Sequence, residues 1–330
     1  MRKSQVRGLF FESLVKKLLY NSGYTSITDG KIQGRGEKHQ IDAYGKFSFH
    51  VPFVFPIRLL AEAKWYSTNV KLQHVRNFVG VVKDISENYF VKPRTNVNEL
   101  NELLEKRYTD CGAIFSATSF SIQAQRYAYA QCIYLIPYNN NSILKDILND
   151  VNVIINYNLD RFSIKNIYYE DSQDIIKYKN LVDDLLNSDL RLSNNLQGIG
   201  SYLGILDGIY PVHILSDKKI QFNTEKPDEY KLNINKDMMY LEDDCIRIIF
   251  NDEYNEKIEF NFPLIIANEL LASFTDYLKI SPFSYIDIPI TIINKDQQSM
   301  RRIYQLRINS EDRIKIRDNL NKWLKGDYHF

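Results

Sequence analysis

The sequence predicts an α/β fold with a mixed central sheet, followed by a second α+β domain. A helical pattern opens the chain, three runs rich in β-branched and aromatic residues follow, and later strand-like runs alternate with helical ones. Strands joined by short loops pair as a meander, whereas strands separated by a helix need crossovers. The predicted order is therefore helix, three strands and a helix, then strand, helix and strand.

The first element is predicted to be an amphipathic helix over residues 4–20. Leu9, Phe10, Leu14 and Leu18 recur at helical spacing, Ser4 is available as the N-cap, and Gly23 stands just past the end. Three strands follow at 24–32, 39–49 and 57–65, broken by the turn Gly34-Arg-Gly36 and by two prolines. The next elements are helices at 75–89 and 97–107, a strand at 111–116, a helix at 121–131 and a strand at 132–136.

We place a domain boundary at residue 150, which gives domains of residues 1–150 and 151–330. The second domain is predicted to contain helices at 171–190, 263–278 and from residue 310. Strands are expected around 202–215 and at 285–293, with a hairpin formed by 245–250 and 257–262. This domain is expected to serve in regulation, recognition or oligomerisation.

Composition excludes several classes of protein. The 330 residues are 44% hydrophobic and 25% charged, as in a globular chain, and no stretch approaches the roughly 18 apolar residues that span a bilayer. The N-terminus lacks the pattern of a secretory signal, so we expect a cytoplasmic protein without membrane contact. Three scattered cysteines support neither a disulfide framework nor a zinc site.

Charge is distributed unevenly along the chain. The net charge is +1, but residues 1–95 carry 16 Lys and Arg against 7 Asp and Glu, a net charge of +9, and the rest carries −8. A basic segment within a neutral protein is typical of a surface that binds a polyanion. A chance distribution of solvated charges is the alternative.

Two charged residues interrupt the apolar strand predicted at 57–65. In Ala61-Glu62-Ala63-Lys64 the side chains of Glu62 and Lys64 share one face, because side chains alternate across a strand. Asp42 lies on the preceding predicted strand and converges with this pair if the two strands are neighbours. The alternative is an exposed ion pair on an edge strand, which stabilises little.

Two carboxylates at such a distance repel each other unless a cation lies between them. Hard oxygen ligands suit Mg²⁺ or Mn²⁺, which bind a few carboxylates together with waters and phosphate oxygens. Such a metal activates water and stabilises negative charge on a phosphoryl oxygen, while Lys64 can position the water. Asp42, Glu62 and Lys64 therefore predict metal-dependent phosphodiester hydrolysis.

Several motifs along residues 5–137 resemble the PD-(D/E)xK nuclease superfamily, and its Mrr-like restriction endonuclease branch in particular. The matching segments are Phe11-Glu12, Gly34 to Asp42, Ala61 to Lys64, Val75 to Gly80 and Gly112 to Phe120. Ile41 stands where the superfamily's name has proline. The resemblance implies a restriction-endonuclease-like αβββαβ core, Asp42 and Glu62 as metal ligands, and Lys64 as the catalytic lysine. It also implies Glu12 as a supporting acid and Gln73 as a catalytic-site residue, although His74 and Arg76 are as well placed for a phosphate.

The expected function is a Mg²⁺-dependent endodeoxyribonuclease that cuts double-stranded DNA in prokaryotic defence. We expect a homodimer, or a subunit of a defence complex with an ATPase or another sensor. One alternative is a DNA-sensing or scaffold subunit without catalysis, and another is a nuclease that acts on RNA or branched repair intermediates. His39 could contact the substrate, but a hydrogen-bonded or solvated histidine is the preferred interpretation. Gly34-x-Gly36 lacks the Lys-Ser/Thr of a P-loop, so we expect a turn that approaches the DNA backbone.

Overall fold

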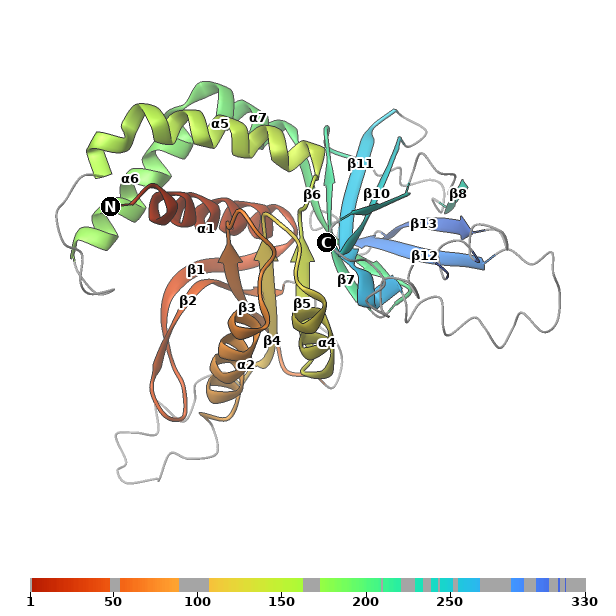
Figure 1. The fold of residues 1–330 in the computed structure, drawn as a ribbon, viewed down its shortest axis with the longest axis horizontal. Coiled ribbons are helices and arrows are strands. Elements are labelled where there is room, and N and C mark those ends of the chain that lie inside the picture. Colours follow the sequence, from red (N-terminus) through yellow and green to blue (C-terminus); the bar gives the residue numbers. More distant parts are fainter. Residues whose placement is uncertain are drawn as a thin grey trace.

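Within the residues that the structure describes, the protein forms two β-sheets, of five and eight strands. Figure 1 shows α1 lying across the five-stranded sheet, with further helices above it and the eight-stranded sheet beside it. The computed structural model describes residues 2–47, 54–88, 107–162, 173–208, 210–220, 229–233, 239–242, 244–251, 255–267, 286–293, 301–308, 314 and 318.

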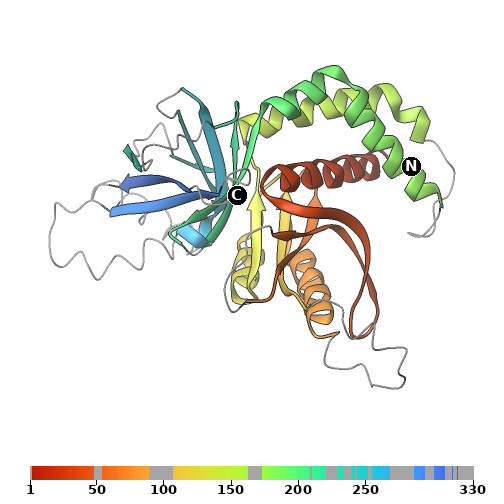
Figure 2. The same ribbon diagram turned by 180° about the vertical axis from the view of Figure 1, so that it is seen from behind.

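The first sheet has the strand order β1-β2-β3-β4-β5 and is mixed, as predicted. β1, β2 and β3 form an antiparallel meander, and β3, β4 and β5 run parallel because helices connect them. Bulges in β1 bend the long β1–β2 hairpin, which curls away from β3 (Figure 2). The strands are β1 Tyr24–Gln33, β2 Lys38–Phe47, β3 Ile57–Lys64, β4 Thr109–Ser116 and β5 Ile133–Pro137.

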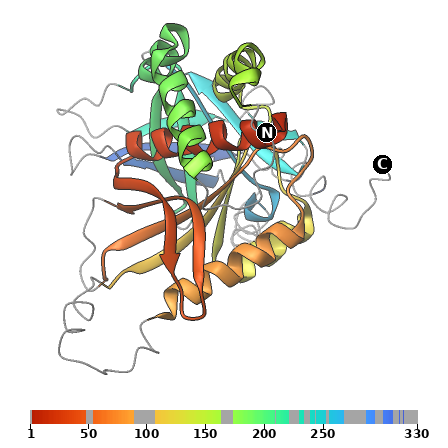
Figure 3. The same cartoon turned by 90° about the vertical axis from the view of Figure 1, so that its left-hand side faces the viewer.

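Helices cover both faces of this sheet (Figure 3). On one face, Phe11 and Leu14 of the first helix share a core with Ala61 and Ala63 of β3. On the other face, Leu60 of β3 packs with the apolar sides of two shorter helices. The helices are α1 Lys3–Asn21, α2 Leu72–Ser86 and α4 Ile122–Ala130.

The predicted elements of the first sheet are confirmed, apart from details at their ends. Ser4 was the wrong N-cap: the N-cap is Arg2, because the side chain of Gln5 accepts a hydrogen bond from the Arg2 backbone N–H at 2.9 Å. Gly23 follows the helix with φ of 99°, a conformation that glycine adopts readily. The helix predicted at 97–107 falls almost entirely outside the described residues.

Three helices that follow the first sheet belong to its hydrophobic core. They are α5 Ser142–Asn158, α6 Gln173–Ser188 and α7 Leu190–Gly198, with a 3-10 turn at Leu159–Phe162. Their apolar residues, including Ile155 and Val182, share one core with α1 and β3. The boundary at residue 150 stays a prediction, and α5 runs through that position. We propose residue 199 instead, because the core of the first sheet includes described residues as far as Ile199 and, beyond it, only Leu215 of the second sheet among its buried members.

The second sheet begins directly after α7, with the order β8-β13-β12-β6-β7-β11-β10-β9. Its neighbours are antiparallel except β13 and β8, which run parallel. The strands are β6 Gly200–Leu206, β7 Tyr210–Ser216, β8 Glu229–Asn233, β9 Met239–Glu242, β10 Cys245–Asn251, β11 Lys257–Pro263, β12 Ile286–Ile293 and β13 Arg301–Ile308.

The predicted hairpin is confirmed as β10 and β11, and the strands predicted around 202–215 and at 285–293 as β6, β7 and β12. Helical backbone after Pro263 is described at 264–267, and the rest of that predicted helix lies outside the described residues. So does most of the helix predicted from residue 310. β8, β9 and β13 were not predicted. None of the described helices is both long and apolar enough to cross a membrane.

The two sheets are joined by a buried polar contact around His213. The Tyr138 hydroxyl lies 2.7 Å from His213 Nδ1, and the hydroxyls of Ser22 and Ser201 lie 3.0 and 2.9 Å from Nε2. Burial lowers the pKa of His213 to about 3, so its imidazole is neutral near pH 7. β7 is thereby fixed against the end of α1 and the residue that follows β5.

Candidate active site

Asp42 and Glu62 lie together where β2 and β3 end their pairing. Ala43 and Ala61 are the last paired residues at this end of the two antiparallel strands. Asp42 precedes Ala43 on β2, and Glu62 follows Ala61 on β3. Asp42 Oδ2 accepts a hydrogen bond of 2.9 Å from the backbone N–H of Ala63. Ala61 and Ala63 are buried against α1, which leaves Glu62 and Lys64 on the opposite side of β3, as the alternation predicts.

Lys64 is the cation of this group. Its Nζ lies 2.5 Å from Glu62 Oε1 and 3.9 Å from Asp42 Oδ2, and each of the three side chains is between 18% and 25% exposed. Burial lowers the pKa of Lys64, but the carboxylates of Glu62 and Asp42 outweigh burial, so its pKa lies above the ordinary value. Lys64 therefore stays an ammonium group beside two carboxylates.

Glu12 approaches the same group from α1. Its carboxyl is mostly buried, and burial together with the charge of Asp42 raises its pKa to about 8, although Lys179 and Lys64 act in the opposite direction. Burial and the charge of Glu62 likewise raise the pKa of Asp42 to about 6, against the effects of Lys64 and the Ala63 N–H. The structure thus brings together Glu12, Asp42, Glu62 and Lys64, which the sequence predicted as site residues.

Two further charged residues extend the cluster and were not predicted. Lys179 on α6 places its Nζ 2.5 Å from Asp29 Oδ2 and 4.0 Å from Glu12 Oε2. Asp29 on β1 also binds Lys16, with 3.1 Å between Nζ and Oδ1. Lys179 and Asp29 are 150 positions apart in the chain, so no local motif could have indicated their contact. Burial raises the pKa of Asp29, but the two lysines outweigh it and hold this pKa below the ordinary value.

Gln73 is not joined to the carboxylates by any contact among the described residues. It is exposed on the first turn of α2, where its Nε2 donates to Asn77 Oδ1 at 2.8 Å. Its neighbour His74 packs against the ring of Tyr66, with centroids 5.1 Å apart. Arg76 lies over Tyr127 instead.

The turn at Gly34 and Gly36 is fixed to α2 through Asp84. The Asp84 carboxylate lies 2.6 Å from His39 Nε2 and accepts a hydrogen bond from the Gly36 N–H at 2.8 Å. Hydrogen bonds from His39 and from the backbone hold the pKa of Asp84 below its ordinary value. His39 is therefore a hydrogen-bonded residue that closes this turn, in agreement with the preferred interpretation of the sequence.

The donor set fits a hard divalent cation that would share the site with substrate. In the described parts of the chain no group of three or more His, Cys, Asp or Glu side chains is placed to hold a metal ion. Mg²⁺ commonly uses one or two carboxylates and completes its shell with waters and phosphate oxygens. Asp42 and Glu62 supply two adjacent oxygen donors, and a cation would stabilise the charged forms of Asp42 and Glu12, whose pKa values burial and a neighbouring carboxylate raise.

Comparison with known proteins agrees with this geometry. Residues 4–92 match the model of the Mrr catalytic family, described as a restriction endonuclease. The match includes Glu12, Asp42, Glu62, Lys64 and Gln73, and also Asp29, but ends well before Lys179.

Other comparisons add no argument about function. A search of curated proteins gave no match. A crystal structure of a protein of unknown function, AF1548, aligns at 15% identity over 54% of this chain and 97% of that chain, with a TM-score of 0.30. A resemblance at that level supports no conclusion about fold or function.

The resemblance predicted from the sequence is therefore confirmed for the N-terminal region. Its helix α1, its meander β1–β3 and its family match agree with a restriction-endonuclease-like core. Residues 4–92 are thus similar to the catalytic domain of Mrr-type restriction endonucleases.

Proposed function

We propose that the protein is a Mg²⁺-dependent endonuclease that hydrolyses phosphodiester bonds of double-stranded DNA. The observation that carries this proposal is the convergence of Asp42, Glu62 and Lys64 at the point where β2 and β3 separate. The Lys64 ammonium group contacts both carboxylates, and burial together with the charge of Asp42 raises the pKa of a third acid, Glu12.

In this proposal Asp42 and Glu62 would hold a Mg²⁺ ion, which would polarise the scissile phosphate and lower the pKa of a bound water. Lys64 positions the attacking water and stabilises the negative charge that develops on the phosphate oxygens. A bond forms between the water oxygen and phosphorus while the bond from phosphorus to the 3′ oxygen breaks. The products are a 5′-phosphate and a 3′-hydroxyl, which takes up a proton.

Charge supports a polyanionic substrate. The segment that contains these residues has the net charge of +9, whereas the rest of the chain is acidic. A basic surface attracts the phosphate backbone without reading sequence, and the salt dependence of such binding reports the number of phosphate contacts. We propose a role in defence against foreign or modified DNA. We also propose action as a homodimer or within a complex with an ATPase or other sensor, because one active site per chain cuts one strand at a time.

The test is cleavage of plasmid DNA by variants that keep the fold. Asp42→Ala and Lys64→Ala should lower the cleavage rate by about 10³-fold or more, because each removes a group that acts on the reacting phosphate. Lys145→Ala on the exposed side of α5 is the control and should cleave at the wild-type rate. Undiminished cleavage by Asp42→Ala, or in EDTA, would refute the metal mechanism.

A DNA-sensing subunit without catalysis is the second candidate, since the basic segment supports DNA binding on its own. Calorimetry with MgCl₂ separates the two: the nuclease binds the ion through Asp42 and Glu62, and a sensor has no need to. Substrate panels of duplex DNA, single-stranded DNA, junctions and RNA then distinguish a duplex nuclease from one that acts on RNA or branched intermediates.

A further inference from the structure

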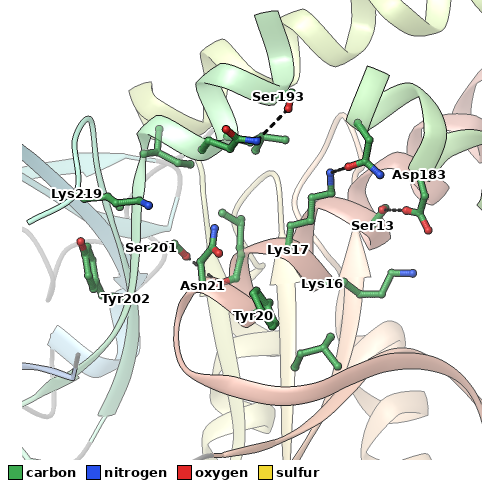
Figure 4. Close-up of a pocket in the computed structure, with 17 residues that line it drawn as sticks. Ser13, Lys16, Lys17, Tyr20, Asn21, Asp183, Ser193, Ser201, Tyr202 and Lys219 are labelled. Carbon is green, nitrogen blue, oxygen red and sulfur yellow. Dashed lines mark hydrogen bonds between the residues drawn. The ribbon is translucent and has the colours of Figure 1, made fainter. Parts of the chain in front are cut away.

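A cleft of about 740 Å³ lies between the first sheet's helices and the second sheet, and neither Asp42 nor Glu62 lines it. The last two turns of α1 form one side, α6 and α7 form another, and the start of β6 with Lys219 forms the third (Figure 4). Clefts that hold small molecules usually measure about 300–1,000 Å³ and often lie between structural units. The size and position of this cleft are therefore those of a ligand site.

The charged side chains that line the cleft are mostly cationic. Among the described residues they are Lys16, Lys17 and Lys219, against one carboxylate, that of Asp183. That carboxylate accepts a hydrogen bond from the Ser13 hydroxyl, which uses part of its ability to accept hydrogen bonds. Lys16 is paired with Asp29, so the argument for an anionic ligand depends on the other two lysines.

Lys17 and Lys219 differ in their surroundings but both contribute positive charge to the cleft. Lys17 donates to the amide oxygen Oδ1 of Asn187 at 2.7 Å, and burial lowers its pKa although Asp183 acts in the opposite direction. A half-buried ammonium group is stabilised by a negative partner more than by an amide. Lys219 is exposed, and Figure 4 shows its side chain extending from the second sheet toward the side of α1.

The negative ends of two helix dipoles oppose anion binding here, because α1 and α7 both end at the cleft. This opposition is small, at about 0.3–1 kcal/mol for each helix end, and hydrogen bonds already use several terminal carbonyls. The Leu18 carbonyl, for example, accepts hydrogen bonds from the N–H and hydroxyl of Ser22 and from the Ser201 hydroxyl. Full charges on two lysines outweigh these partial charges.

Uncharged side chains complete a surface suited to an organic group. Tyr20 is 59% exposed at the rim, although aromatic side chains usually bury more of their area. Asn21 and Gln197 present amides that can donate and accept hydrogen bonds, and Gln197 makes one long contact of 3.4 Å with the Ser193 hydroxyl. A stackable ring beside amides is a common arrangement for recognising a planar polar group.

We propose that this cleft binds a phosphorylated small molecule of nucleotide size. Its phosphate groups contact Lys17 and Lys219, and its uncharged part contacts Tyr20, Asn21 and Gln197. The inference concerns binding alone and does not depend on whether the protein cleaves DNA.

Calorimetry on the full chain tests the proposal, with sodium tripolyphosphate and with ATP, each in EDTA, as probes. The wild type should bind at least one of them with a Kd below about 1 mM, since two charge-assisted contacts suffice for that affinity. Lys17→Met and Lys219→Met should each weaken binding by about tenfold, the factor that corresponds to 1.4 kcal/mol. Lys145→Met, which lies outside the cleft, should bind as the wild type does.

The two probes distinguish the sources of the phosphate. Tighter binding of ATP supports a nucleotide, whereas tighter or equal binding of tripolyphosphate would overturn the role given to Tyr20, Asn21 and Gln197 and leave only an inorganic polyphosphate site. Absence of binding for both probes would overturn the proposal. Wild-type affinity in both Lys17→Met and Lys219→Met would overturn it as well, and the exposed Lys219 provides that comparison even if Lys17→Met folds poorly.

Discussion

Replacing Lys179 with methionine removes the ammonium group that α6 contributes beside Glu12. Lys179 Nζ lies 4.0 Å from Glu12 Oε2 and 2.5 Å from Asp29 Oδ2. Asp29 keeps Lys16 as a partner after the substitution, so the larger effect falls on Glu12. The charge of Lys179 also lowers the pKa of Asp42, which lies farther away.

The magnitude follows from the distance. Two unit charges 4 Å apart interact by about 4 kcal/mol at an effective dielectric constant near 20, and by about 1 kcal/mol in water. The two side chains are 23% and 21% exposed, so the value lies between these limits. Since one pKa unit equals about 1.4 kcal/mol, Lys179→Met should raise the pKa of Glu12 by at least about one unit.

The assay is the pH dependence of plasmid cleavage at saturating Mg²⁺. If ionised Glu12 supports the reaction, the acid limb of the Lys179→Met profile should move to higher pH by about one unit or more. Lys179→Arg keeps the positive charge and should restore the wild-type limb, while Lys177→Met, exposed on the same helix, is the control. The reasoning fails if the limb of Lys179→Met does not move, or if Lys179→Arg shifts it equally.

Two further predictions concern stability. Glu12 has a folded pKa of about 8 against an ordinary value of 4.5, so the metal-free protein should lose stability as pH rises between these values. Glu12→Gln should match the wild type near pH 4 and be more stable by roughly 1–4 kcal/mol above pH 8, measured by urea unfolding in EDTA; equal stability at high pH would contradict the burial of a charged Glu12. A Cβ at Gly34 would lie 2.0 Å from Asp84 Oδ2 and 2.9 Å from the Glu37 carbonyl oxygen, so Gly34→Ala should destabilise the protein by about 1–3 kcal/mol. Gly80→Ala is the control and should be neutral or stabilising, because nothing lies within 4 Å of the added Cβ. Both glycine variants are compared by thermal unfolding, and equal melting temperatures would argue against a tight contact at Gly34.

The sequence alone was sufficient for the central group of the candidate site. Glu62 and Lys64 are two positions apart on one strand, and Asp42 is on the strand that precedes it, so alternation and meander pairing bring all three together. Both rules are local and depend on backbone geometry. The helix that carries Glu12 was likewise predicted from the sequence, because the spacing of its apolar residues determines which helix face packs on the sheet.

Tertiary structure decided the rest. Lys179 reaches Glu12 because α6 packs on α1, a contact that depends on side-chain complementarity between segments far apart in the chain. Helix α5 crosses the predicted boundary at residue 150, and only burial shows that its apolar side belongs to the first core. Gln73 was placed by its position in a motif, but its amide pairs with Asn77 on its own helix. Local spacing determines which residues share a strand or a helix face, whereas packing between distant elements determines which charges share a site.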